Sequence, residues 1–142
     1  MRPGDIIAAE VSYSKGLFTA TIEDVNARQS YASPPTGVPG AGTDSAEWIV
    51  ESADYNCILA LTPVSQVTFT GAIATINGAT HTIAGWGADA YLLLMVDYNW
   101  GFNAESEVAP PYTQTLAYAK ADTSALGRAG GSFNVNWLSS GP

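Results

Sequence analysis

Hydrophobic and polar residues alternate with a period of two wherever the chain is not turning, and this period is typical of β-strands with one covered face. The clearest example lies at residues 18–23, where Phe18, Ala20 and Ile22 share one face and Thr19, Thr21 and Glu23 the other. No window has the apolar spacing of an amphipathic helix. Half-buried strands are therefore predicted at 18–23 and at three further segments with the same alternation: 7–13, 67–69 and 133–137.

Two other segments have distinct patterns. Asn77-Gly78 lies between residues 72–76 and 79–83, and both residues tolerate the positive φ of a type I′ turn, so a β-hairpin is predicted there. Residues 91–96 are apolar on both faces, which indicates a strand covered from both sides, with a buried helix as the alternative.

Two segments are predicted to be long loops, and both could form the walls of a cleft. One is 32–44, with three prolines and three glycines, and the other is 97–112, which carries Trp100, Phe102, Glu105 and Glu107. Many short strands separated by turns predict an all-β fold, an antiparallel sandwich or barrel.

Composition supports one domain over residues 1–142. Hydrophobic residues make up 46% of the chain, which is enough for one core, and 14 glycines and 8 prolines fit a turn-rich β protein. The single cysteine, Cys57, cannot form an intramolecular disulfide and is interpreted as a small buried hydrophobe.

The charge balance excludes several classes of partner. Thirteen acids against five bases give a net charge of −8, which disfavours nucleic acid and anionic membranes but leaves a polycationic partner open. The longest apolar stretch, 90–96, is far shorter than the ~20 residues of a membrane helix. The start of the chain has no apolar run of the signal-peptide kind.

The segment 45–51 (SAEWIVE) places two carboxylates within a run of strong strand formers. As a strand it puts Glu47, Ile49 and Glu51 on one face and the core residues Trp48 and Val50 on the other. The glutamate face either meets solvent or lines a cleft. The two glutamates are ~13 Å apart in a strand, too far for a glycosidase-like carboxylate pair at ~5–9.5 Å.

This segment resembles the most distinctive motif of the glutamic peptidases, or eqolisins, which are acid endopeptidases with a concanavalin-like β-sandwich. The resemblance keeps family order from residue 3 to residue 137. Besides 46–51 it is carried by PGDII at 3–7, VSYS at 11–14, residues 18–24 with Gln29-Ser30, VTFT at 67–70 and GSFNVNW at 131–137.

The resemblance implies a catalytic dyad of one glutamate and one glutamine. Glu47 falls at the motif position of the catalytic glutamate, and Glu51, on the same face, is the second choice. The glutamate acts as general base and then general acid, while the glutamine amide stabilises the oxyanion. The resemblance further implies a polypeptide substrate, an extracellular location and no cofactor.

The chain departs from the family pattern at the glutamine. In the family the catalytic glutamine precedes the Gly-Asp entry strand, where this chain begins. Gln29 lies in a turn-like segment, Gln66 flanks a strand and is expected at the surface, and Gln114 lacks the family context, so none is assigned the role. We therefore expect an incomplete sandwich that lacks the family's N-terminal strands and is inactive alone.

Two alternatives remain. A non-catalytic sandwich could bind carbohydrate or extended peptide through Trp86, Tyr98 and Trp100, or an incomplete domain could self-associate through exposed strand edges. The sequence has one histidine, His81, and no Gly-x-Ser-x-Gly motif that would supply a nucleophile for a histidine-based catalytic triad. His81 is therefore expected to be an ordinary strand or surface residue. No metal-ligand spacing occurs, so no metal is expected.

Overall fold

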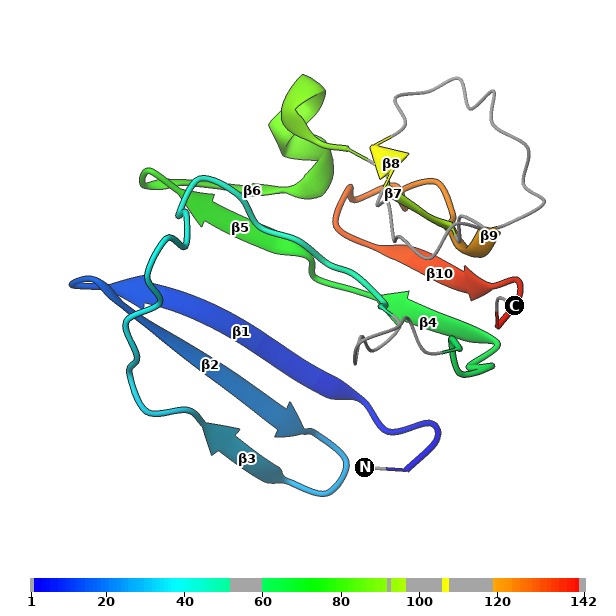
Figure 1. The fold of residues 1–142 in the computed structure, drawn as a ribbon, viewed down its shortest axis with the longest axis horizontal. Coiled ribbons are helices and arrows are strands. Elements are labelled where there is room, and N and C mark those ends of the chain that lie inside the picture. The colour runs from blue at the N-terminus through cyan, green and yellow to red at the C-terminus, as the bar shows by residue number, and fades with distance from the viewer. Residues whose placement is uncertain (1, 52–59, 92, 97–105, 108–118, 141–142) are drawn as a thin grey trace. The chain divides into compact units, whose positions relative to one another are not determined.

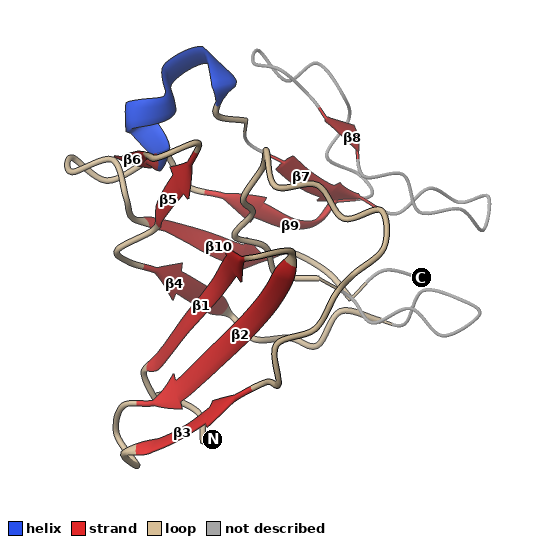
Figure 2. Ribbon diagram, turned by 90° about the vertical axis from the view of Figure 1, so that its left-hand side faces the viewer, coloured by secondary structure: helices blue, strands red, loops and turns tan. Residues whose placement is uncertain are grey.

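The computed structural model describes residues 2–51, 60–91, 93–96, 106–107 and 119–140. The chain divides into two compact units, Met1–Ser45 and Ala46–Pro142, each of which is described by itself. The described residues form antiparallel strands with one short 3-10 helix, and no sheet closes into a barrel among them (Figure 1, Figure 2). The predicted all-β antiparallel fold is confirmed.

The first unit is a three-stranded sheet in the order β1-β2-β3. Its strands are β1 (Ile7–Ser14), β2 (Leu17–Asp24) and β3 (Gln29–Ala32). The two predicted strands in this unit are confirmed, but Gln29 opens β3 rather than lying in a turn, which corrects the sequence interpretation. Lys15 and Gly16 both have positive φ, 52° and 82°, so a two-residue turn joins β1 to β2.

The cross-strand register sorts this sheet into two chemically different faces. On the first face Ile22 lies opposite Tyr31 and Ala9, while the other face carries Glu10 and Glu23. The predicted half-burial of β1 is wrong, because every residue of β1 is exposed. A 45-residue unit of three strands has no second layer of its own with which to cover an apolar face.

The second unit contains a five-stranded antiparallel sheet and a separate hairpin. The sheet order is β4 (Gln66–Phe69), β10 (Phe133–Trp137), β9 (Ala119–Thr123), β7 (Leu93–Val96) and β8 (Ser106–Glu107). The hairpin pairs β5 (Ile73–Ile76) with β6 (Ala79–Thr82) through Asn77-Gly78. These two residues have φ of 52° and 81°, which confirms the predicted type I′ geometry.

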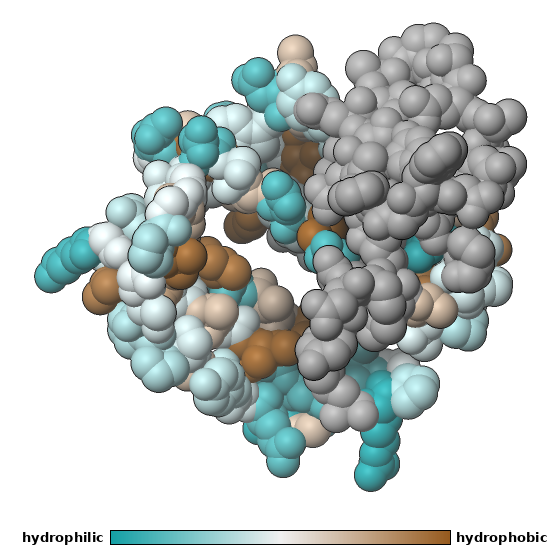
Figure 3. Space-filling view, in the orientation of Figure 1, coloured by the Kyte–Doolittle hydropathy of each residue, from teal (hydrophilic) through white to brown (hydrophobic). Residues whose placement is uncertain are grey.

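The core of the second unit lies on one face of this sheet. Leu61, Ala121, Phe133 and Val135 are buried together, and the rings of Phe69 and Phe133 stack with centroids 4.9 Å apart. The alternation predicted at 67–69 and 133–137 is thus confirmed. Apolar side chains also reach the surface, as the brown areas of Figure 3 show.

The remaining segments follow the predictions in part. β7 begins at Leu93, so the apolar run 91–96 contains a strand and not the alternative helix. Residues 33–45 form the predicted loop, with one bridge from Thr36 to Phe18. The second predicted loop was 97–112. Two of its residues, Ser106 and Glu107, form β8 and pair with β7, and its other residues lie outside the described part of the chain. Among the described residues, no helix has the length and apolar character required to cross a membrane.

Candidate active site

The candidate site is the segment that carries Glu47. Trp48 and Val50 are half-buried and pack against the core of the second unit, while Glu47, Ile49 and Glu51 are exposed. This alternation confirms the two faces predicted from the sequence. Trp48 and Val50 face the core, and the glutamates therefore lie on the opposite, exposed side of the segment.

The predicted strand at 47–51 is wrong. Within the described part of the chain, no sheet ladder or backbone hydrogen bond includes these residues. The segment keeps the period of a strand because its apolar side chains pack on one side. It is not assigned as a strand, because no backbone of the described residues pairs with it.

Gln66 lies on the far side of the sheet from Glu47. Gln66 opens β4 and its neighbour Val67 lies opposite the core residue Val135, so Gln66 points away from the core. Trp48 packs onto the core from the other side, and Glu47 points outward from there. The structure therefore does not bring Glu47 and Gln66 together.

The other two glutamines lie outside the described part of the second unit. Gln29 belongs to the first unit, on β3, and Gln114 lies outside the described residues. Glu51 shares the exposed side with Glu47, so the structure leaves both glutamates accessible.

Gln66 is part of a polar row across three strands that the sequence analysis missed. Its Nε2 donates to Asn136 Oδ1 at 2.9 Å, and Asn136 Nδ2 donates to Asp122 Oδ1 at 3.0 Å. Two residues further along β4, Thr68 Oγ1 donates to Asn134 Oδ1 at 2.9 Å. The sequence does show polar residues at alternate positions, Asn134 and Asn136, which indicates a polar face on this strand. The residues that bond to them could not be predicted, because they depend on how β10 is aligned with its neighbouring strands.

Of the aromatic platform of the binding-module hypothesis, only Trp86 belongs to the described residues. Trp86 is half-buried in the 3-10 helix η1 (Ile83–Asp89), and His81 packs on it edge to face with centroids 4.9 Å apart. Tyr98 and Trp100 lie outside the described residues, as does Cys57. No group of three His, Cys, Asp or Glu side chains that could hold a metal occurs in the part of the chain that the structure describes.

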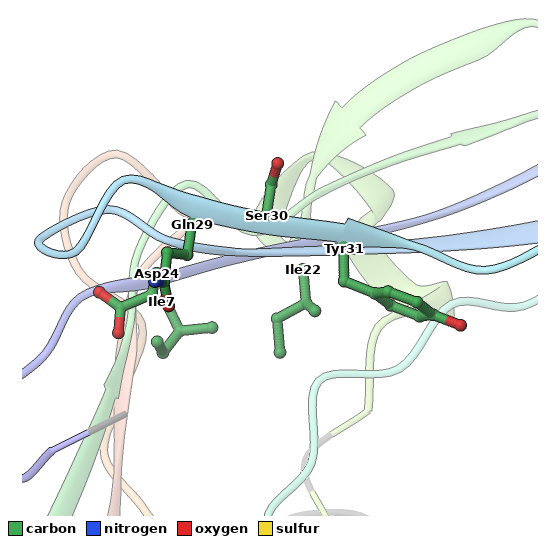
Figure 4. A pocket seen from close by; sticks show the side chains of 6 residues that line it. All are labelled: Ile7, Ile22, Asp24, Gln29, Ser30 and Tyr31. Atoms are coloured by element: carbon green, nitrogen blue, oxygen red, sulfur yellow. The ribbon is translucent and has the colours of Figure 1, made fainter.

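A pocket of about 270 Å³ lies on the apolar face of the three-stranded sheet (Figure 4). It is lined by Ile7, Ile22, Asp24, Gln29, Ser30 and Tyr31. The sequence analysis did not find it, because the register between three strands brings these residues together.

Comparisons with known proteins agree with this fold. A sequence model described as the Peptidase A4 family matches residues 1–97. The chain is similar to aspergilloglutamic peptidase from Aspergillus niger, with a TM-score of 0.67 and 26% identity, over 97% of this chain and 69% of that one. No curated protein matches the sequence. The resemblance to glutamic peptidases stated from the motifs is thereby confirmed.

Proposed function

Because the chain belongs to the peptidase A4 family, we propose that it hydrolyses peptide bonds at acid pH and that Glu47 carries the proton transfers. The observation that supports this proposal is the exposed carboxyl of Glu47, held on a segment whose neighbours Trp48 and Val50 pack into the core. Anchored neighbours restrict the position of a catalytic group, and exposure lets a polypeptide reach it.

The proposed reaction needs one carboxyl in two successive states. The ionised carboxyl of Glu47 takes a proton from a water molecule, whose oxygen attacks the scissile carbonyl carbon. The protonated carboxyl then gives that proton to the leaving nitrogen as the carbon–nitrogen bond breaks. One group can thus act as base and acid without a cation in the site.

A carboxamide completes the proposal by stabilising the oxyanion of the tetrahedral intermediate. Gln66 is a poor candidate because it lies beyond the core from Glu47. We therefore propose that the carboxamide belongs to a glutamine-bearing segment like the one that precedes the Gly-Asp entry in the resembled family. Without this partner the 142-residue chain is expected to be inactive or nearly so.

The proposal also covers the substrate, the location and the domain organisation of the enzyme. Its substrate is a polypeptide, it acts outside the cell without a cofactor, and residues 1–142 belong to one sandwich domain. The excess of thirteen acids over five bases is compatible with an acid environment, because protonation of the carboxyl groups lowers the net charge and its self-repulsion.

The test is digestion of a denatured protein at pH 2–5 in the presence of pepstatin. The chain is assayed alone and joined behind the glutamine-bearing strands of a family member. We expect cleavage from the joined protein, unaffected by pepstatin, and little from the chain alone. A folded joined protein that cleaves nothing, but binds peptide, would overturn the peptidase proposal.

A further inference from the structure

Ile49 is a large apolar side chain beside the proposed catalytic carboxyl. It is 45% exposed and lies between Glu47 and Glu51 on the exposed side of the segment, while Trp48 and Val50 face the core. The core of the second unit therefore does not account for an isoleucine at this position. A single exposed apolar residue is common on protein surfaces, so its position next to Glu47, and not its exposure alone, distinguishes Ile49.

The spacing along the segment matches the spacing of an extended substrate. Side chains two residues apart in an extended chain share one side and lie about 6.5 Å apart. Exposed and packed side chains alternate at 47–51, so Glu47 and Ile49 are related by this repeat. An extended polypeptide has the same repeat. When it lies along the segment with its scissile bond at the carboxyl of Glu47, a side chain within two residues of that bond lies over Ile49.

The chemistry of Ile49 selects an apolar side chain. Its branched Cβ leaves few rotamers, so little conformational freedom is lost when a ligand covers it. Contact with a leucine or phenylalanine side chain removes apolar surface of both partners from water, which is favourable in proportion to the area buried. An asparagine or serine in the same place loses hydrogen bonds to water, because isoleucine offers neither a donor nor an acceptor.

The two flanking carboxyl groups limit the choice further. An acidic side chain over Ile49 would meet Glu47 and Glu51 in a protein whose net charge is −8. A lysine could lay its stem on Ile49 and bring its ammonium group to Glu51. Because that ion pair would be exposed, salt would screen it and it would contribute little to binding. The position of Ile49 therefore favours an apolar occupant over a charged one.

We propose that Ile49 determines the specificity of the proposed peptidase, through contact with an apolar side chain of the substrate within two residues of the bond that is cut. The inference rests on the proposed function for its substrate class, a polypeptide, and for the position of the reacting carboxyl. Ile49 takes no part in the proton transfers. Substitutions at this residue therefore change which bond is cut more than they change the chemistry.

The first test measures peptide binding to the full 142-residue chain. The probes are the blocked peptide acetyl-Thr-Thr-Leu-Thr-Thr-amide and its analogues with asparagine or lysine in place of leucine. Leucine and asparagine have similar shapes, so the difference between them reports apolar contact. We expect the leucine peptide to bind about three- to tenfold more tightly than the asparagine peptide, as partial burial of two aliphatic side chains supplies. Added salt should leave this preference unchanged, since no charge takes part in it.

Two variants and a matched control locate the preference. Ile49→Val keeps most of the apolar surface and should retain the preference for leucine. Ile49→Thr has nearly the shape of valine but carries a hydroxyl, and it should reduce the preference to about twofold or less. Ile73→Thr is the control, because Ile73 is 58% exposed on β5 of the same unit and lies outside the segment of Glu47. It should leave the preference unchanged, and far-UV circular dichroism checks that all three variants are folded.

The second test maps the cleavage sites of the joined enzyme in a denatured protein mixture by mass spectrometry. We expect apolar residues to be enriched at one position within two residues of the cut bond. Ile49→Thr should reduce this enrichment, while Ile73→Thr should not. The total rate of cleavage should fall less than the enrichment, because the carboxyl of Glu47 is unchanged.

Equal affinity for the leucine and asparagine peptides, or equal effects of Ile49→Thr and Ile73→Thr in folded proteins, would overturn the inference. Tighter binding of the lysine peptide than of the leucine peptide, lost on Glu51→Gln, would overturn it in favour of a basic occupant. A folded joined enzyme that cleaves nothing, although the binding preference depends on Ile49, would refute only the peptidase proposal. Cleavage at sites that Ile49→Thr does not change would refute only this inference.

Discussion

At the scale of single residues, the polar row on β4, β10 and β9 shows how one side chain can depend on two others. Asn136 accepts from Gln66 and donates to Asp122, and both Asn136 and Asp122 are half-buried. Gln66, at the end of the row, is exposed. Loss of the middle residue therefore removes two hydrogen bonds, whereas loss of the end residue lets water replace one.

We expect Asn136→Ala to lower the free energy of unfolding by about 1–3 kcal/mol, because the half-buried carboxylate of Asp122 loses a donor. Gln66→Ala, the matched control, should cost less than about 0.5 kcal/mol at its exposed position. Urea unfolding followed by tryptophan fluorescence measures both. Equal effects of the two substitutions would show that the row does not act as a unit.

At the scale of secondary-structure elements, the sequence predicts strands well where side chains alternate strongly. Phe18 to Glu23 and Phe133 to Trp137 carry large apolar residues on one face, and Asn77-Gly78 tolerates the positive φ that a two-residue hairpin turn requires. β9 was not predicted from its alternation of small alanines with Lys120 and Asp122, which have weak strand propensity.

The candidate site was predictable in part for the same reason. The alternation around Glu47 predicted correctly which side chains are exposed, because that depends on local pattern and packing. Strand pairing of 47–51 and the position of Gln66 relative to Glu47 depend on which backbones become neighbours. A single segment does not contain that information.

The turn before β10 gives a prediction at this scale. Gly130 has a φ of 74°, and a Cβ there would lie 2.5 Å from the Cβ of Ala84 in η1. We expect Gly130→Ala to destabilise the fold by about 1–3 kcal/mol through backbone strain and this clash. Gly78→Ala is the control with positive φ but nothing within 4 Å, and it should cost less. Thermal melts of the two variants make the comparison, and equal losses would contradict the role of the Ala84 contact.

At the scale of the whole molecule, the three-stranded sheet of the first unit has two outer edges that no described strand pairs with. One of them is β1, an eight-residue strand with Val11 72% exposed. Long edges with apolar side chains pair readily with other chains. The net charge of −8 opposes such association at neutral pH, and protonation of the carboxyl groups removes much of this opposition.

We therefore expect the 142-residue chain to self-associate through β1, more strongly at pH 4 than at pH 7. Val11→Lys places a charge on the apolar face of that strand and should reduce association, while Thr21→Lys, on the opposite face of the neighbouring strand, should reduce it less. Sedimentation velocity at both pH values measures the mass. A monomer at high concentration at pH 4 would show that the edges are protected.

The central claim is that the carboxyl of Glu47 performs the chemistry, and kcat/KM of matched variants tests it most directly. In the chain joined to glutamine-bearing strands, Glu47→Gln replaces one carboxyl oxygen with an amide nitrogen at an exposed site, so the fold should be unchanged. We expect kcat/KM for a polypeptide at acid pH to fall by about two to four orders of magnitude. Glu51→Gln, on the same side of the segment, should change it less than about tenfold if its carboxyl only meets solvent. Full activity of Glu47→Gln together with an inactive, folded Glu51→Gln would contradict the assignment.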